Sequence, residues 1–119
     1  MDRYGEERVL HNPWINFGDR YGRRWAQPDI ILMPEEFEPL IIIECKLTYT
    51  KRDAEKQLRE LYYPLARNIW GVNSKDCKLV QACKNLTRHT DRRRLVHDIR
   101  DVMDYQSRRN YQIWNWRQN

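Results

Sequence analysis

Three charged side chains in the first half of the chain have the types and the spacing that could hydrolyse a phosphodiester bond. Asp29 stands at the start of a short apolar run, and Glu44 and Lys46 come at the end of a longer one, Leu40 to Leu47. Because side chains alternate along a strand, Glu44 and Lys46 would share one face and lie about 7 Å apart. If the two runs form a hairpin, Asp29 joins them, and two carboxylates and one ammonium converge.

Such a cluster suits metal-assisted hydrolysis. Asp29 and Glu44 offer the hard oxygen ligands that Mg²⁺ prefers, and the backbone carbonyl of Cys45 could complete the coordination. The metal would lower the pKa of a bound water and neutralise charge on the phosphate, while Lys46 would orient the water or stabilise developing charge. The alternative is a structural ion-pair cluster, because charges within a buried apolar strand need partners.

Pro28-Asp29, followed by Glu44-Cys45-Lys46 at the end of an apolar strand, resembles the PD-(D/E)xK nuclease superfamily. The resemblance covers residues 14–83 and includes the strand–strand–helix–strand order of that fold's core. It implies Mg²⁺- or Mn²⁺-dependent cleavage of DNA, with Asp29 and Glu44 as metal ligands and Lys46 as the catalytic lysine. Some members add a glutamate from the first helix, and either Glu6 or Glu7 could fill that place.

RecB-like members of this superfamily also carry a Gln followed four residues later by a Tyr, on the helix after the lysine. Gln57 stands where that glutamine would, and the resemblance assigns it to the catalytic centre. Position 61 is Leu, and the tyrosines are Tyr62 and Tyr63, so the role of a tyrosine stays open.

A second acid-x-lysine tripeptide, Asp76-Cys77-Lys78, has the same local spacing. It has no upstream Asp at a suitable distance and no apolar strand before it, so we interpret it as a solvated strand start. The three cysteines, Cys45, Cys77 and Cys83, form no CxxC pair. We expect free thiols, and the number excludes a four-cysteine iron–sulfur cluster or a zinc site built from cysteine alone.

Composition is that of a polar globular chain. Its 119 residues are 40% hydrophobic and 33% charged, with a formal net charge of +5 that is compatible with a polyanionic partner. No apolar run could cross a bilayer, and no secretory signal opens the chain. We therefore expect no membrane partner and a cytoplasmic location, in a bacterium or a phage-infected host cell.

The elements that position these residues are predicted from periodicity and from capping signals. They are a short helix over Asp2 to Leu10, a turn and strand over 12–18, a strand over Pro28 to Met33, a strand over Leu40 to Leu47, a helix from Lys51 to Gly71, a strand over Cys77 to Cys83, and a helix after Thr90. Thr50 would cap the long helix, and Pro64 would kink or break it.

This order predicts an α/β fold with a mixed central sheet flanked by helices, and the resemblance makes it a restriction-endonuclease-like core. We expect one domain over residues 1–119, with a basic and aromatic C-terminal extension from about residue 105. The extension could stack on unpaired bases, but we favour packing onto the body or a homodimer contact.

Three groups of cations are candidates for DNA contact. Arg23 and Arg24, with Arg20, lie in a predicted loop beside Gly18 and Gly22 and could clamp the DNA backbone. Lys51 and Arg52 would begin the long helix, close to the catalytic strand. Arg92, Arg93 and Arg94 would occupy the first turn of the last helix, where cations oppose the dipole, so they suggest a phosphate partner as readily as a solvated face.

These observations predict a metal-dependent DNA endonuclease. Small members of the resembled superfamily include junction-resolving enzymes, often dimeric and often phage-encoded, so a structure-specific activity is a narrower expectation. A DNA exonuclease or a restriction-type enzyme is the alternative with the same chemistry. A catalytically silent DNA-binding module is the alternative from another class.

Overall fold

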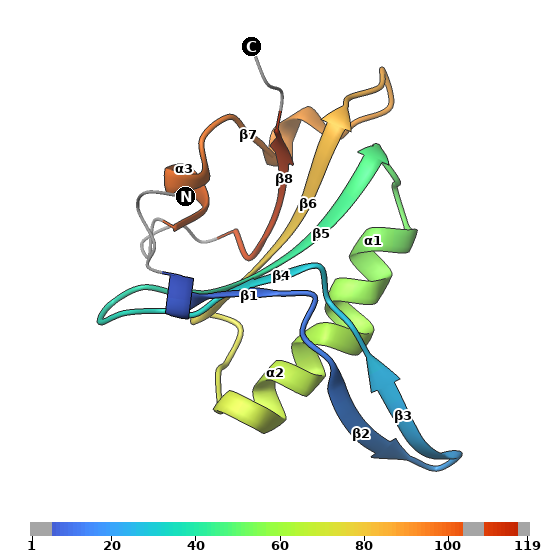
Figure 1. Ribbon diagram of the computed structural model, residues 1–119. Helices are drawn as coiled ribbons and strands as arrows, with labels where there is room; N and C mark the ends of the chain where they lie inside the picture. Colours follow the sequence, from blue (N-terminus) through green and yellow to red (C-terminus); the bar gives the residue numbers. More distant parts are fainter. Residues whose placement is uncertain (1–5, 104–108, 117–119) are drawn as a thin grey trace.

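The computed structural model describes residues 6–103 and 109–116, and its centre is a six-stranded mixed sheet (Figure 1). The strands follow the order β1 (Val9–His11), β4 (Ile30–Leu32), β5 (Leu40–Thr48), β6 (Cys77–Asn85), β8 (Tyr111–Asn115) and β7 (Leu95–Val96). Neighbouring strands from β1 to β5 are antiparallel, and those from β5 to β7 are parallel. The predicted α/β class with a mixed central sheet is confirmed.

The predicted hairpin is formed by β4 and β5. Ile30 lies opposite Ile43 in this antiparallel pair, so Asp29, one residue before β4, comes opposite Glu44. The residues of β5 alternate between two apolar clusters. Leu40 and Ile42 pack on one face of the sheet, and Ile41 and Ile43 pack on the other. The run is apolar on both sides because helices cover both faces.

The long helix covers the first of these faces, as Figure 1 shows in green. It comprises α1 (Asp53–Lys56), the π-helical segment η2 (Gln57–Tyr62) and α2 (Tyr63–Trp70). Its start is two residues later than predicted, and the Oγ of Thr50 accepts only a long hydrogen bond, 3.4 Å, from the amide of Ala54. Gly71 ends it at φ 70°, the left-handed conformation that glycine adopts readily.

The predicted last helix is wrong. Residues 90–103 instead form the 3₁₀ turn η3 (Arg92–Arg94), the short strand β7 and helix α3 (Ile99–Met103). Leu95 and Val96 pair with β8, and Asp98 accepts from the amide of Arg100 at the start of α3. Val102 and Met103 of α3 pack in the apolar cluster on the second face of the sheet.

The segment that we described as a C-terminal extension supplies an inner strand. β8 lies between β6 and β7, and its Tyr111 and Ile113 are buried in the core. Packing onto the body is therefore confirmed for residues 109–116, while residues 104–108 and 117–119 lie outside the described part of the chain. Tyr111 is buried in the core, whereas Trp114 and Trp116 are partly buried against the apolar cluster on the second face of the sheet.

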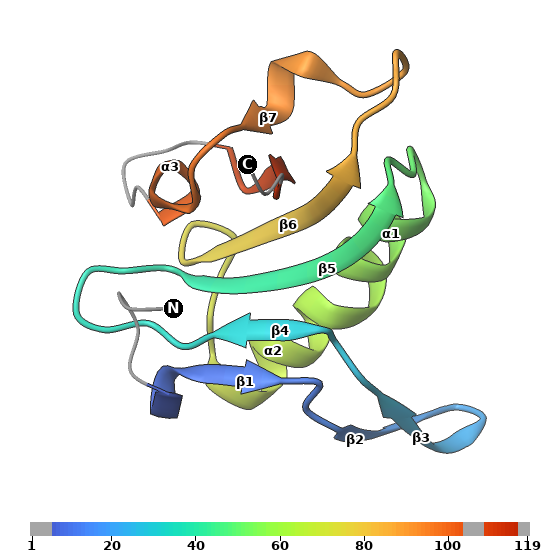
Figure 2. The same cartoon turned by 45° about the horizontal axis from the view of Figure 1, so that its top comes forward.

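The arginine loop predicted after Gly18 is a β-hairpin. β2 (Ile15–Asp19) pairs with β3 (Gly22–Ala26) as a separate two-stranded sheet that projects beyond the six-stranded one (Figure 2). Gly22 turns the chain at φ 113°, and the carboxylate of Asp19 accepts from the amide of Tyr21. Arg23 and Arg24 therefore lie on a strand.

Two further features of the fold bear on the predictions. The start of the chain, predicted as a helix, is the 3₁₀ turn η1 (Glu6–Arg8) followed by β1 within the described residues. The three cysteines are free, as predicted. None of the described helices has the length and apolar character needed to cross a membrane.

Candidate active site

Asp29 and Glu44 meet where β4 begins beside the second half of β5. The Oδ2 of Asp29 accepts a hydrogen bond of 2.8 Å from the amide of Cys45, which holds the aspartate against β5. Glu44 is only 4% exposed, although it is a charged residue type. The β4–β5 register thus places the two carboxyl groups side by side, as the hairpin prediction required.

This proximity shifts the protonation of Glu44. Burial, a hydrogen bond with Asp29 and the Asp29 charge raise the pKa of Glu44 from 4.5 to about 8, whereas Lys46 and Tyr62 act in the opposite direction. Glu44 therefore keeps its proton near neutral pH when no cation is present. A divalent cation between the two carboxyl groups would take that proton's place, because it stabilises both ionised groups.

Lys46 lies on the same face of β5 and contacts the long helix. Its Nζ donates to the Oε1 of Gln57 at 3.4 Å, a long hydrogen bond that leaves the ammonium room to meet another group. Both residues line an open cleft of about 610 Å³. The other lining residues are Asp53, Lys56, Glu60 and Leu61. The structure therefore brings Asp29, Glu44, Lys46 and Gln57 to one region.

Tyr62 is a site residue that sequence reasoning left open. Its hydroxyl lies 3.3 Å from the Oε2 of Glu44 and 3.3 Å from the carbonyl of Gln27, so it reaches both. Tyr62 stands five residues after Gln57, a spacing that an ordinary α-helix does not keep on one face. Here the π turn of η2 aligns them, since the amide of Tyr63 donates to the carbonyl of Leu58, five residues back.

Gln81 is a second residue that the sequence did not reveal. It is fully buried in β6, beside Glu44 in the strand register. Its Oε1 accepts from the amide of Thr50 at 2.8 Å, and its Nε2 donates to the Thr50 carbonyl at 2.9 Å and to the Tyr111 hydroxyl. The side-chain amide of Gln81 therefore fixes the loop that joins β5 to the long helix.

The donor set fits a magnesium-like ion better than a soft metal. Asp29 and Glu44 supply carboxylate oxygens, and the Cys45 carbonyl points to the same strand edge as its amide, toward Asp29. The Cys45 thiol packs on the other face, and burial raises its pKa to about 11, so it stays protonated. No three His, Cys, Asp or Glu side chains converge within the described residues.

The backbone of η1, which carries both N-terminal glutamates, lies away from this pair of carboxylates in the fold. Glu6 and Glu7 belong to η1, which precedes the Val9 end of β1. Val9 lies opposite Leu32, whereas the amide of Asn12, at the other end of β1, donates to the carbonyl of Asp29. The length of β1 therefore separates η1 from Asp29.

The second tripeptide is not a solvated strand start. Lys78 is 2% exposed within β6, and its Nζ donates to the carbonyl of Arg109 at 3.1 Å. It is paired with Ile41 in the strand register, on the sheet face opposite Glu44. Its register partner Ile41 and its acceptor Arg109 are both remote from it in sequence.

The candidate DNA-contacting cations lie in three places. Arg23 and Arg24 are exposed on β3, and Lys51 and Arg52 are exposed just before α1. Arg92 to Arg94 form η3, next to the β7 edge of the sheet, and are not part of a helix N-terminal turn. None of these cations is among the residues that line the cleft beside Lys46.

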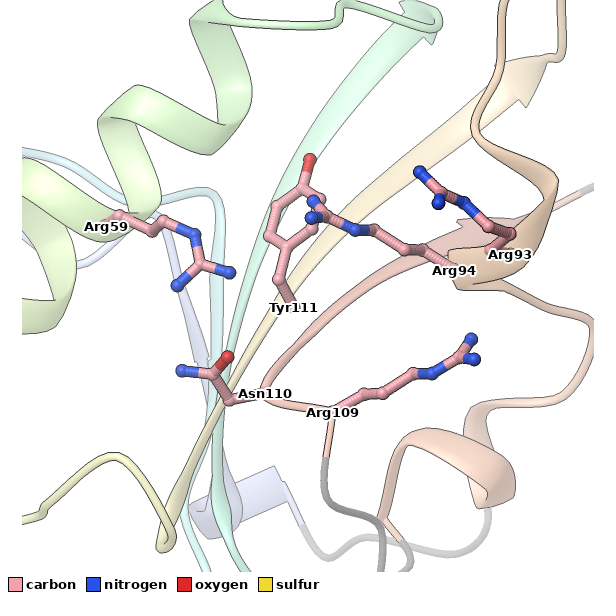
Figure 3. A pocket seen from close by; sticks show the side chains of 6 residues that line it. All are labelled: Arg59, Arg93, Arg94, Arg109, Asn110 and Tyr111. Atoms are coloured by element: carbon pink, nitrogen blue, oxygen red, sulfur yellow. The ribbon is translucent and has the colours of Figure 1, made fainter.

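Two of the η3 arginines line a separate basic pocket of about 350 Å³ (Figure 3). Arg59 reaches it from the long helix, and Arg109 and Asn110 reach it from the start of β8, around the Tyr111 ring. Arg94 donates to both oxygens of Glu55 at 3.0 Å and lies 5.2 Å from the Tyr111 ring centre. Arg94 is therefore a packing contact as well as a cation.

Comparison of the chain with protein-family models, with curated proteins and with solved structures finds no match. The site geometry therefore carries the functional argument.

Proposed function

We propose that the protein is a divalent-metal-dependent deoxyribonuclease with an endonucleolytic mode and a restriction-endonuclease-like core. The observation that carries this proposal is the pairing of Asp29 with Glu44, two residues before Lys46 on the same strand face. A buried acid with a raised pKa beside a second acid is a costly arrangement, and such arrangements cluster at functional sites.

The roles follow from the chemistry of each group. Asp29, Glu44 and the Cys45 carbonyl would hold Mg²⁺ or Mn²⁺, which lowers the pKa of a bound water and neutralises phosphate charge. Lys46 would orient the attacking water or stabilise the developing phosphorane, and Gln57 would hold the ammonium in place. Lys46 and Gln57 line an open cleft of about 610 Å³, where the substrate would lie.

The test is cleavage of a supercoiled plasmid by the purified protein in Mg²⁺ or Mn²⁺, with EDTA as the blank. An endonuclease converts closed circles to open circles, whereas an exonuclease leaves them intact. Asp29→Asn and Glu44→Gln should abolish conversion and weaken metal binding in calorimetry, because each removes a charged ligand. Glu36→Gln, at an exposed acid in the β4–β5 connection, is the matched control.

Conversion at the wild-type rate by either ligand variant would contradict the site assignment. Metal and DNA binding without cleavage of plasmid, linear or four-way-junction DNA by the wild-type protein would favour a silent DNA-binding module instead.

A further inference from the structure

One face of the β2–β3 hairpin carries two exposed indoles. Trp14 is 64% exposed and Trp25 is 61% exposed, and their rings meet edge to face with centres 6.2 Å apart. They line an open apolar cleft of about 430 Å³. Large aromatic side chains that are exposed together on a small hairpin commonly mark an interaction surface.

The rest of that face is polar and cationic. The register places Asn16 beside Trp25 and Gly18 beside Arg23, so these side chains share the face of the indoles. Arg23 donates to the Oδ1 of Asn16 at 3.2 Å, which holds its guanidinium near the strand. A Cβ at Gly18 would meet nothing within 4 Å, so this part of the surface is open.

The hairpin is anchored next to the candidate active site. Ile15 and Ala26, on its opposite face, are buried in the core cluster that also contains Tyr62. Trp25 precedes Asp29 by four residues, so their Cα atoms lie at most about 14 Å apart. A strand held at Asp29 and Glu44 could therefore reach the indoles within a few nucleotides.

The charge of the hairpin distinguishes between two molecules that could bind this surface, a second copy of the chain and a polyanion. The hairpin carries Arg20, Arg23 and Arg24 against one acid, Asp19. A symmetric contact with a second copy through the indole face would bring the Arg23 guanidinium groups of the two copies together, and like charges would oppose it. A polyanion instead meets them favourably, and unpaired bases stack on aromatic side chains whatever their sequence.

We infer that this face of the hairpin, Trp14, Asn16, Arg23 and Trp25, binds unpaired bases of a DNA strand beside the cut site. The indoles stack on bases, and Arg23 contacts a phosphate. The inference rests on the proposed nuclease function and narrows its substrate to DNA with a single-stranded region. Blunt duplex DNA keeps its bases paired and stacked and gains nothing from the indoles.

The experiment measures the affinity of the Asp29→Asn protein, in which cleavage is blocked, for three labelled probes by fluorescence anisotropy. The probes are an oligothymidylate, an abasic sugar-phosphate strand of equal length and charge, and a blunt duplex. Trp25→Ala should weaken oligothymidylate binding by about tenfold or more, the loss of one stacked base, and leave the other two unchanged. Trp25→Phe should retain most of the affinity.

Phe37→Ala is the control, because Phe37 is 78% exposed and lies in the β4–β5 connection. An equal loss on the abasic strand, or no loss on any probe, would overturn the inference. So would a dimer that Trp25→Ala dissociates without changing affinity for oligothymidylate.

Wild-type cleavage in Mg²⁺ is assayed in parallel. If the wild-type protein cleaves DNA but oligothymidylate binding does not depend on Trp25, only this inference is contradicted. If binding depends on Trp25 but the wild-type protein cleaves nothing, the nuclease proposal is contradicted.

Discussion

At the scale of single residues, Lys46 should serve the chemical step and leave metal binding intact. Lys46→Ala is expected to lower the cleavage rate at least about a hundredfold, the scale of one removed electrostatic or acid–base group. Metal affinity should stay the same or rise, because a cation beside the carboxylates is removed. Single-turnover cleavage and calorimetry separate the two quantities.

Lys84→Ala, at an exposed position at the end of β6, is the control for this substitution. Lys78→Ala is unsuitable, since Lys78 is buried and its loss would destabilise the fold. A Lys46→Ala protein that cuts at the wild-type rate would remove Lys46 from the mechanism.

The carboxyl pair also predicts how stability depends on pH. In the metal-free protein the pKa of Glu44 is raised from 4.5 to about 8, so between these values the folded state keeps a proton that the unfolded chain has lost. The free energy of unfolding should therefore fall as pH rises from about 5 to about 8, by up to about 1.4 kcal/mol per pH unit. The stabilisation is fully present below pH 4.5 and lost above the raised pKa.

Urea unfolding in EDTA at several pH values measures this slope, and Glu44→Gln corrects for other titrating groups. The difference between the two proteins should show the slope, and a difference that is flat from pH 5 to 8 would contradict the raised pKa of Glu44.

The sequence predicted the residues of the candidate site that depend on strand geometry alone. Glu44 and Lys46 share a face because alternation is strict in a strand, and Asp29 joins them through the hairpin register. Tyr62 was left open because its spacing from Gln57 does not fit a regular helix. The burial of Lys78 depends on neighbours from distant parts of the chain, which local hydropathy does not contain.

At the scale of elements, the π turn of η2 corresponds to one added residue in the long helix. Deleting the exposed Glu60 should let a regular α-helix form with Gln57 and the tyrosine four residues apart, still on one face. Cleavage should then fall by no more than a few-fold. Inserting one Ala after Glu60 should rotate the tyrosine by about 100° and lower the rate much further.

Circular dichroism confirms that both variants are helical before their cleavage rates are compared. A folded deletion variant as inactive as the insertion variant would show that the π turn itself is required.

Long apolar runs gave the correct elements, and mixed segments did not. Leu40 to Leu47 and Cys77 to Cys83 are strands as predicted, because each is buried on both sides. The apolar residues Leu95, Val96, Ile99, Val102 and Met103 fit a helical period by coincidence. These residues belong to two elements, because Leu95 and Val96 pair with β8 in the sheet.

At the scale of the whole molecule, cations lie at both edges of the sheet, so we expect DNA to be bound through its backbone. The hairpin arginines adjoin the β1–β4 side, and Arg93 and Arg109 lie on the β8–β7 side. Affinity of the Asp29→Asn protein for duplex DNA should fall with salt at a log–log slope of about −0.9 per neutralised phosphate. Arg23→Gln and Arg93→Gln should each reduce that slope by about 0.9 and weaken unrelated sequences alike.

Arg94 is left in place because it pairs with Glu55 of the long helix, whereas Arg93 pairs with Asp91 beside it in the chain. Binding is measured for several duplexes and a four-way junction at four or five salt concentrations. Strong preference for one duplex sequence would contradict backbone recognition and favour a restriction-type enzyme, whereas preference for the junction would favour a resolvase.

The position of β8 has a consequence for the order in which the chain folds. β7 is made before β8 during synthesis, yet β8 is the strand through which β7 joins the sheet. β7 therefore stays unpaired until β8 has docked on β6. Strand closure at this edge is a late, non-local step, and the amides of β7 should be the first in the sheet to exchange with solvent.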